Sequence, residues 1–334
     1  MEAALLRSRN FSATEFYYDI IAKALKAEYE LIYDGFEESE LPKQKNVLIV
    51  CGSCMEMVRL WQKGYRRIVT WSQGALPEES YMRNRSRLRK TVLSCFEKFA
   101  LTHSALNIVV SNAMVDHYEK TYGIVLGNIY VMPCYNVEFQ EKRIAEKDPE
   151  SRVFVYAGGL SRWQCVEQML SLYKKIESTV KGQAKLLFFT PEIDEAKRLA
   201  ARHGIVNSEI KRVHYSELAE EMKHAKFGFA LREDIPLNRV AAPTKLANYV
   251  AGGIIPVYSE CVHDFYEQSR RNPYQVAIHD VNKITDAELD RIIGLLEKRI
   301  AAADLQSKMH TYFERYYNTE WHIQNLSEIL VKII

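Results

Sequence analysis

Short apolar runs alternate with longer amphipathic stretches along the whole chain. The clearest apolar runs are 46–50 (NVLIV), 107–111 (NIVVS), 153–157 (VFVYA), 185–189 (KLLFF) and 227–231 (FGFAL). Weaker runs occupy 3–6, 31–33, 67–71, 129–132 and 254–258. Such continuous runs are typical of strands buried on both faces of a parallel sheet. Helical periodicity between them predicts an α/β fold with helices on both faces of each sheet.

The length of 334 residues predicts two domains, at about 150 residues per domain. The polar, charged stretch 142–151 (KRIAEKDPES) interrupts the pattern and marks the crossing between them. We therefore expect a first domain over 1–148, a second over 149–315 and a terminal helix over 316–334.

Composition narrows the class of protein. The chain is 47% apolar and 26% charged, as in ordinary soluble proteins, and its net charge of +2 gives no case for a nucleic-acid partner. No run approaches the roughly 18 apolar residues of a membrane span, and the N-terminus does not resemble a signal peptide. We expect a cytoplasmic protein.

Two of the six cysteines, Cys51 and Cys54, form a C-x-x-C directly after an apolar run. This placement occurs in redox sites, but no second cysteine pair is present for zinc and the rest of the chain does not look like thioredoxin. A redox site and a structural role are the two readings of this motif.

The stretch from Leu231 to Glu260 carries the strongest local signals. Pro243 suits a first helical position, 244–251 suits a short helix, and Gly252 and Gly253 suit its end. The run 254–258 then predicts a strand, with Pro256 at its start or in an edge strand.

Lys245 falls in the first turn of this predicted helix, where the backbone already carries partial positive charge. A helix N-terminus, the hydroxyl of Thr244 and a lysine together make a good phosphate site. The alternative is a lysine that points into solvent.

A second cation stands in a similar place. Gly158 and Gly159 follow the strand 153–157 and let the backbone approach a ligand closely. Ser161 and Gln164 have the spacing of a capping box, which predicts a helix from there to about 178 with Arg162 in its first turn. Two cations at two helix starts favour a shared anion over two solvated side chains.

Four segments resemble one enzyme family. They are 71–90 (WSQGALPEESYMRNRSRLRK), 109–123 (VVSNAMVDHYEKTYG) with 129–139 (IYVMPCYNVEF), 154–170 (FVYAGGLSRWQCVEQML) and 238–258 (NRVAAPTKLANYVAGGIIPVY). In this order they resemble retaining, family-4-like glycosyltransferases of the GT-B fold, of the type that assembles bacterial capsule and O-antigen.

The resemblance implies two Rossmann-like domains facing a central cleft, with the C-terminal helix crossing back to the N-terminal domain. It implies transfer of a sugar, by an enzyme of the hexosyltransferase type, from a nucleotide-sugar to a glycan or polyprenyl-diphosphate-linked acceptor. Family members retain the anomeric configuration by front-face attack, in which the donor phosphate takes the acceptor proton. The chain has no D-x-D motif, so we expect no metal and no cofactor.

The resemblance also assigns residues. Arg162 and Lys245 would grip the donor diphosphate and act in catalysis. The other donor-binding residues would be Gly158, Gly159, His214, Tyr215, Arg232, Asn238, Arg239, Thr244 and Asn248. On the acceptor side the candidates are Gln73, Gly74 and Arg7.

Three positions depart from the family pattern. Asn248 replaces the glutamate that holds the ribose, Val240 replaces a second glutamate eight residues earlier, and Gly159 replaces an arginine for which Arg162 would substitute. Two alternatives therefore stay open: a non-catalytic GT-B partner of another transferase, and a GT-B sugar-nucleotide epimerase.

The stretch 83–99 is basic on one side and apolar on the other. Its cations are Arg83, Arg85, Arg87, Arg89 and Lys90, and its apolar residues are Leu88, Val92, Leu93, Phe96 and Phe99. Such a helix is either a solvated face or a peripheral contact with anionic lipid at the inner face of a membrane.

Overall fold

The computed structural model describes residues 1–8 and 12–333. The chain divides into two compact units. Unit 1 comprises Met1–Asn136, Arg239–Ala242 and Tyr317–Ile334, and unit 2 comprises Val137–Asn238 and Pro243–Tyr316. Residues 137–148, expected at the end of the first domain, group with unit 2, where the Gln140 N–H donates to the Ala251 carbonyl (3.0 Å).

Unit 1 contains a six-stranded parallel sheet in the order β2-β1-β3-β4-β5-β6. Its strands are β1 (Glu2–Leu6), β2 (Glu30–Gly35), β3 (Leu48–Cys51), β4 (Ile68–Ser72), β5 (Leu106–Val109) and β6 (Ile129–Val131). Its helices are α1 (Ser12–Glu28), α2 (Cys54–Gln62), α3 (Leu76–Asn84), α4 (Arg87–His103), α5 (Asn112–Tyr122) and α15 (Thr319–Val331), with a 3-10 turn η1 (Glu38–Glu40). In this order β2 lies on one side of β1, and β3 with the strands after it lies on the other side. The strand order therefore reverses between β1 and β3.

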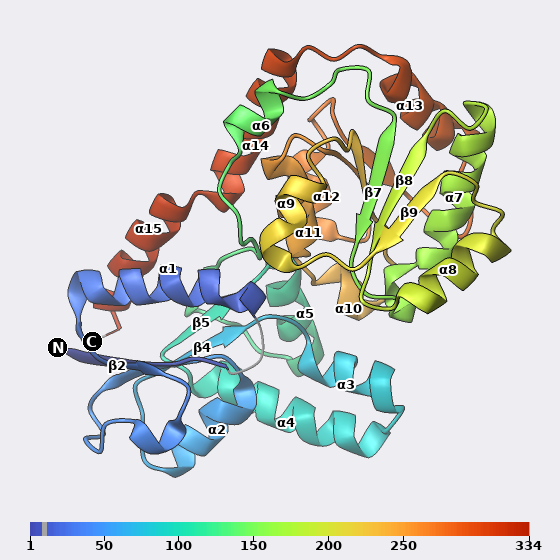
Figure 1. Ribbon diagram of the computed structural model, residues 1–334. Coiled ribbons are helices and arrows are strands. Elements are labelled where there is room, and N and C mark those ends of the chain that lie inside the picture. Colours follow the sequence, from blue (N-terminus) through green and yellow to red (C-terminus); the bar gives the residue numbers. More distant parts are fainter. Residues whose placement is uncertain (9–11, 334) are drawn as a thin grey trace. The chain divides into compact units, whose positions relative to one another are not determined.

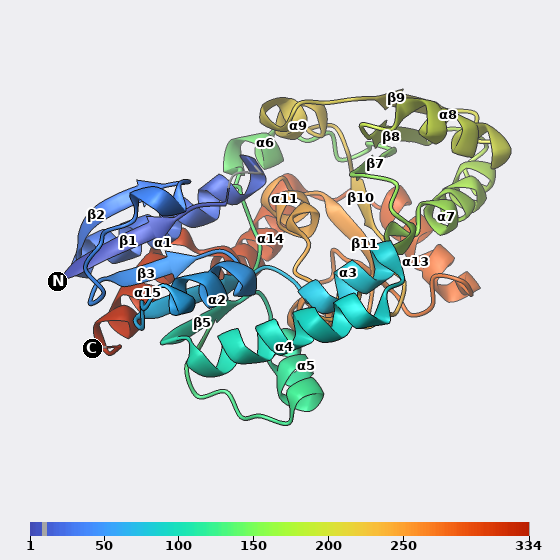
Figure 2. The same cartoon turned by 90° about the horizontal axis from the view of Figure 1, so that it is seen from below.

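Helices cover both faces of this sheet. Figure 1 shows α1 and α15 above the strands and α2 and α4 below them, and Figure 2 shows α2 and α4 from that lower side. The terminal helix is tied to the residue that follows α1 by a buried hydrogen bond from the Tyr29 hydroxyl to the Leu330 carbonyl (2.8 Å). His322 of α15 is buried and bonds through Nδ1 to the Tyr130 hydroxyl (2.8 Å). The prediction that the last helix returns to the N-terminal domain is therefore confirmed.

An aromatic cluster fills the core of unit 1 near the end of β4. Trp71 is fully buried, with Tyr17 stacked on it (4.7 Å between ring centroids) and Tyr18 edge-on to it (5.1 Å). The Tyr17 hydroxyl also donates to the Pro133 carbonyl (2.5 Å). Burial of such large rings dominates core energetics, so this cluster fixes the base of the loop that follows Trp71.

Unit 2 contains a second six-stranded parallel sheet, in the order β12-β11-β10-β7-β8-β9. Its strands are β7 (Val153–Ala157), β8 (Lys185–Phe189), β9 (Ser208–Lys211), β10 (Phe227–Ala230), β11 (Ile255–Ser259) and β12 (Val276–Ile278). Its helices are α6 (Glu141–Ala145), α7 (Val166–Thr179), α8 (Ile193–Arg202), α9 (Leu218–Glu221), α10 (Pro236–Arg239), α11 (Thr244–Ala251), α12 (His263–Ser269), α13 (Asp286–Glu297) and α14 (Ala302–Tyr317), with 3-10 turns η2 (Arg162–Gln164) and η3 (Tyr215–Glu217). When β7 is numbered 1 and the sheet is read from β9 to β12, the strand order is 3-2-1-4-5-6. This is the pattern of nucleotide-binding folds.

These two sheets confirm the predicted fold class, a pair of Rossmann-like domains. In unit 2, α7 and α8 lie on one face of the sheet and α11 lies on the other (Figure 1). Placing connections on both faces is what a doubly wound parallel sheet requires.

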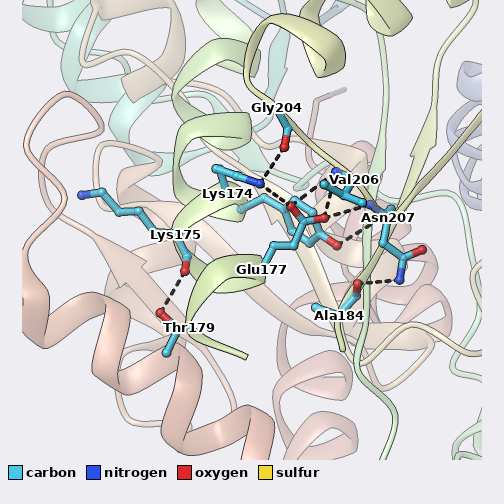
Figure 3. Close-up of polar contacts among 9 residues, drawn as sticks. Lys174, Lys175, Glu177, Thr179, Ala184, Gly204, Val206 and Asn207 are labelled. Carbon is cyan, nitrogen blue, oxygen red and sulfur yellow. Dashed lines mark hydrogen bonds and ion pairs between the residues drawn. The ribbon is translucent and has the colours of Figure 1, made fainter. Parts of the chain in front are cut away.

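A buried carboxylate locks α7 to the strands beside it in unit 2 (Figure 3). Glu177 is 2% exposed and accepts the backbone N–H groups of Val206 (3.1 Å) and Asn207 (2.8 Å) and the Lys174 ammonium (2.9 Å). Burial raises the pKa of Glu177, but the hydrogen bonds outweigh it and the net pKa is lowered. The Asn207 amide then bonds the Ala184 carbonyl (2.8 Å), which continues the connection to the start of β8.

Three local predictions around the glycine-rich loop and the 231–260 stretch were wrong in detail. Ser161 makes no side-chain capping bond; instead η2 is a short 3-10 turn, and α7 begins only after Cys165, which has φ 49°. Pro243 is the N-cap of α11 rather than its first residue. Pro256 is the second residue of β11, a strand that lies between β12 and β10 and is not an edge. Of the two glycines at the helix end, Gly253 adopts the left-handed conformation (φ 62°).

The basic stretch 83–99 is not one helix. Arg85 adopts φ 53° at the end of α3, and the Ser86 hydroxyl caps a new helix by accepting from the Arg89 N–H (3.2 Å). The local S-x-x pattern at Ser86 therefore overrides the continuous amphipathic periodicity. Strands β9 and β12 were also absent from the predicted set.

The C-x-x-C motif is inert. Cys51 is fully buried, Cys54 is 6% exposed, and both are free thiols. Burial raises the pKa of both thiols, that of Cys54 to about 12, so neither group supplies a thiolate at neutral pH. Within residues 1–8 and 12–333, no helix combines the length and apolar character needed to cross a membrane.

Candidate functional site

The topology of unit 2 brings two loops together at one point. β7 and β10 are neighbours, and the chain grows outward from β7 to β8 and β9 on one side and from β10 to β11 and β12 on the other. Gly158 follows β7, and Arg232 follows β10. Ligands of open α/β sheets bind outside the carboxyl ends of the strands at such a switch point. The candidate site is therefore the set of side chains that converge there.

Lys245, in the first turn of α11, reaches this point. Its ammonium nitrogen lies 2.9 Å from Oε1 of Gln164 and 4.3 Å from the centroid of the Tyr156 ring. The side chain is half-buried, and its charged end contacts both of these groups. Burial, and after it the nearby Arg232, lowers the pKa of Lys245 well below its ordinary value.

Arg232 is the second cation of the site. It is 7% exposed, and its Nη1 donates to the same Oε1 of Gln164. Burial lowers its pKa as well. Its backbone N–H donates to the Ser259 hydroxyl (2.7 Å), which fixes the loop to the end of β11. We call Lys245 and Arg232 the cation pair.

The cation pair is not neutralised by any carboxylate among the described residues. In the part of the chain that the structure describes, neither member forms an ion pair with a carboxylate, and the acceptor they share is a neutral amide. Buried cations are normally paired, because an uncompensated charge is costly away from water. This arrangement is typical of a site that an anionic ligand completes.

The start of α11 adds to the positive potential. Its N-cap is Pro243, no side chain caps it, and its first turn contains no acidic residue. The first N–H groups of a helix have no partner within the helix, so they favour an anion.

The glycine-rich loop leaves room for a ligand beside the cation pair. Gly158 has φ 155°, and a Cβ there would lie 2.9 Å from the Lys245 ammonium and 3.3 Å from the Tyr156 hydroxyl. The Tyr156 hydroxyl donates to the Gly159 carbonyl (2.6 Å) and so holds the loop down. Only glycine fits at position 158 without displacing Lys245.

Arg162 lies elsewhere. Its side chain is exposed, and within residues 1–8 and 12–333 it has no hydrogen-bond or ion-pair partner. It lines a hollow of about 710 Å³ together with Glu167, Glu195 and Glu233. The structure brings Arg232, and not Arg162, to the acceptor atom that Lys245 uses.

Several predicted donor residues are engaged within the fold. Asn238 is 2% exposed, and its amide donates to the carbonyls of Glu233 (2.8 Å) and Trp163 (3.3 Å), which joins the loop after β10 to η2. Asn248 donates to the carbonyl of Thr244 one turn earlier on α11 (2.9 Å). These amides hold the backbone around the site.

His214 and Tyr215 form an exposed turn after β9. The His214 ring nitrogen Nδ1 lies 2.8 Å from the Ser216 hydroxyl, and Tyr215 is 39% exposed. Arg239 is exposed and groups with unit 1. Next to it Val240 is buried among apolar residues of unit 1, and its carbonyl accepts from the Ser111 hydroxyl (2.7 Å). A glutamate at position 240 would be placed in an apolar core.

The predicted acceptor-side residues lie at carboxyl ends of strands in unit 1. Gln73 is exposed and Gly74 half-buried in the loop between β4 and α3. Arg7 follows β1 and is neutralised by Asp34 (Nη2–Oδ2, 2.9 Å) and Asp19 (3.0 Å). Arg7 is thus committed to two carboxylates within unit 1.

Sequence reasoning missed Gln164 and Tyr156. Gln164 was assigned to a capping box because of its spacing from Ser161, and Tyr156 was one residue of a buried strand. A polar tip on a strand that ends at a glycine-rich loop was the available signal.

Among the described residues, no group of three or more His, Cys, Asp or Glu side chains is arranged to hold a metal ion.

The chain has the GT-B fold of solved glycosyltransferase structures. It is similar to WaaG, a glycosyltransferase involved in lipopolysaccharide biosynthesis (TM-score 0.66, 11% identity, 99% of both chains covered). It is similar to the sucrose-phosphate synthase of Thermosynechococcus elongatus (TM-score 0.67, 14% identity, 98% of this chain and 80% of that chain). It is also similar to S. aureus TarM, of which it spans 57% (TM-score 0.63, 10% identity, 88% of this chain).

At these identities the likeness concerns the fold. No protein-family model matches the chain, and no curated protein matches it by sequence.

Proposed function

We propose that the protein is a glycosyltransferase that binds the diphosphate of a nucleotide-sugar donor at the cation pair and the start of α11. One observation carries the proposal. Two cations, a buried arginine and a half-buried lysine, share a single neutral acceptor at the switch point of a doubly wound sheet, next to an uncapped helix N-terminus. A diphosphate supplies the charge that this site lacks.

The chemistry follows from that charge. When a sugar leaves a nucleotide-sugar, negative charge builds up on the diphosphate, and preorganised cations and helix N–H groups stabilise it. Gly158 leaves the space in which a phosphate could approach Lys245. Arg162, exposed four residues after Gly158, is proposed as a further contact to the donor, and His214 and Tyr215 as contacts to the nucleobase.

Names of structural neighbours support the ligand class. A point mutant of TarM was crystallised with UDP and alpha-GlcNAc-glycerol, and the pneumococcal O-GlcNAc transferase GtfA with UDP and GlcNAc. For this chain we propose a retaining mechanism, in which the donor phosphate takes the acceptor proton. The acceptor would be a glycan or a polyprenyl-diphosphate-linked sugar in cell-surface polysaccharide synthesis.

Such a lipid-linked acceptor would place the protein in the cytoplasm at the inner face of the membrane. The start of α4 supports a peripheral contact. Leu88 is 77% exposed and Val92 45% exposed, and Arg87 and Arg89 flank Leu88 in a first turn without any acidic residue. A basic helix end with exposed apolar side chains suits an anionic lipid surface.

Thermal-shift measurements with UDP, GDP, ADP, TDP and CMP, followed by the matching nucleotide-sugars, test the donor assignment. A ligand at about 100 times its Kd adds ~2.7 kcal/mol to the free energy of unfolding, which gives a clear rise in melting temperature. The anomeric configuration of the product, read by NMR, then tests retention. If no nucleotide raises the melting temperature, the donor site is lost and a non-catalytic partner becomes the better reading.

A further inference from the structure

Gln164 accepts hydrogen bonds from both members of the cation pair. Its Oε1 accepts from Lys245 Nζ (2.9 Å) and from Arg232 Nη1, and the Tyr156 hydroxyl lies 3.2 Å away. A carbonyl oxygen has two lone pairs. Three donors, two of them cationic, therefore share this oxygen and saturate its accepting capacity.

The shared acceptor solves an electrostatic problem. Two cations that reach one point repel each other, and Arg232 indeed contributes to the lowered pKa of Lys245. With an apolar side chain at position 164 the two cations would lose the acceptor that they share. With a carboxylate there, half of the positive charge of the pair would be neutralised before any ligand arrived. A neutral amide holds both cations and leaves their charge available.

The backbone fixes Gln164 in this role. It ends η2, where its N–H donates to the Ser161 carbonyl (2.8 Å), and Cys165 follows in the left-handed conformation (φ 49°). Cys165 is 2% exposed, and the carbonyl of Trp163 accepts from Asn238. A non-glycine residue with positive φ is uncommon and persists only where its surroundings impose it.

We propose that Gln164 is a positioning residue of the donor site: it holds Lys245 and Arg232 converged in the empty protein, and its neutrality reserves their charge for the diphosphate. This inference rests on the proposed function. On binding, phosphate oxygens replace the amide oxygen as acceptors for one or both cations. The residue thus acts through the cation pair.

Two near-isosteric substitutions separate this role from a purely structural one. Gln164→Glu keeps the length and the accepting oxygens but adds a negative charge. Gln164→Met keeps the length and removes the acceptor. Gln183→Glu, on an exposed turn before β8, makes the same charge change away from the site and serves as the control. Melting temperature and calorimetric affinity for inorganic pyrophosphate and UDP are measured for all four proteins.

For Gln164→Glu we expect stability and affinity to change in opposite directions. The melting temperature rises or is kept, because the carboxylate pairs with both cations. The affinity for pyrophosphate and UDP falls roughly 10- to 100-fold, the value of a hydrogen bond to a charged group. Gln164→Met should melt at a lower temperature, and Gln183→Glu should match the wild type in both measurements.

Three results would overturn the inference. Wild-type affinity in Gln164→Glu would show that the charge at position 164 is irrelevant, while leaving the donor site itself intact. A parallel fall of melting temperature and affinity in Gln164→Glu would reduce Gln164 to a structural residue. If the wild type binds neither pyrophosphate nor any nucleoside diphosphate, the proposed function fails, and the inference fails with it.

Discussion

Glu97 of α4 offers a prediction whose size follows from the structure. Its carboxylate is 3% exposed, accepts from the Tyr122 hydroxyl at the end of α5 (2.7 Å) and bonds the backbone N–H of Leu76, the first residue of α3. It thereby anchors α3 directly after the loop that contains Gln73 and Gly74. Burial, with a smaller contribution from Glu78, raises the pKa of Glu97 from 4.5 to about 7.

The perturbation is Glu97→Gln. Between pH 4.5 and 7 the folded protein binds a proton at Glu97 that the unfolded chain does not, so stability falls as pH rises through this range. The pKa of Glu97 differs by 2.5 pH units between the folded and the unfolded protein. At about 1.36 kcal/mol per unit, this is about 3 kcal/mol of stability, which is fully lost above pH 7. Glutamine removes this cost, because its oxygen can accept from Leu76 N–H and its amide can donate to the Tyr122 hydroxyl.

Hydrogen exchange of residues 87–103 between pH 5.5 and 8.5, corrected for the intrinsic exchange rates, measures the effect within unit 1. Glu97→Gln should be more protected than the wild type at pH 8.5 by up to about 3 kcal/mol, and the difference should shrink towards pH 5.5. Glu28→Gln, an exposed change on α1, should show no such pH dependence. An advantage of Glu97→Gln that is equal at both pH values would refute the reasoning.

Three further changes test other parts of the account. Gly158→Ala puts a Cβ 2.9 Å from the Lys245 ammonium and should cost ~1–2 kcal/mol in backbone strain. Calorimetry should show UDP binding weakened about tenfold or more. Normal binding would show that the loop has no close ligand contact. Lys226→Met leaves the carbonyls of Pro149, Leu296 and Lys298 without their buried ammonium and should lower the free energy of unfolding by about 3 kcal/mol in urea. Glu177→Gln should destabilise unit 2 by about 2 kcal/mol at pH 7, and since the pKa of Glu177 is lowered, this wild-type advantage should disappear as pH falls through that pKa.

Apolar runs made most strands predictable, because a strand buried on both faces needs an unbroken apolar sequence. The runs 153–157, 185–189 and 227–231 became β7, β8 and β10 almost residue for residue. β9 and β12 were not predicted because they are short. In addition, β9 (SEIK) is only partly buried and mostly polar.

The site was predictable only in part. Lys245 stood out because a cation at a helix start is unfavourable alone, and the structure enclosed its charged end. Its partner could not be read locally: Arg232 meets it only because β10 lies beside β7, and strand order depends on contacts far apart in sequence.

Local patterns also misled at two places. Ser161 and Gln164 have capping-box spacing, yet the buried cations recruit Gln164 and the turn stays 3-10. The amphipathic periodicity of 83–99 continues across Arg85, where the backbone turns left-handed and a new helix begins. At 161–164 tertiary interactions outweigh a capping motif worth about 1 kcal/mol. At Ser86 a local helix cap outweighs the amphipathic periodicity.

The central claim is that Lys245 belongs to an anion site that a nucleoside diphosphate completes. Calorimetric titration of UDP, or of the nucleotide that gives the largest thermal shift, into wild type, Lys245→Met and Lys197→Met tests it most directly. Lys197 is an exposed lysine of α8 and controls for net charge. The account predicts a roughly 10- to 100-fold loss of affinity in Lys245→Met alone, with a melting temperature equal to or above that of the wild type, because an enclosed, repelled charge has been removed. Wild-type affinity in Lys245→Met would contradict it.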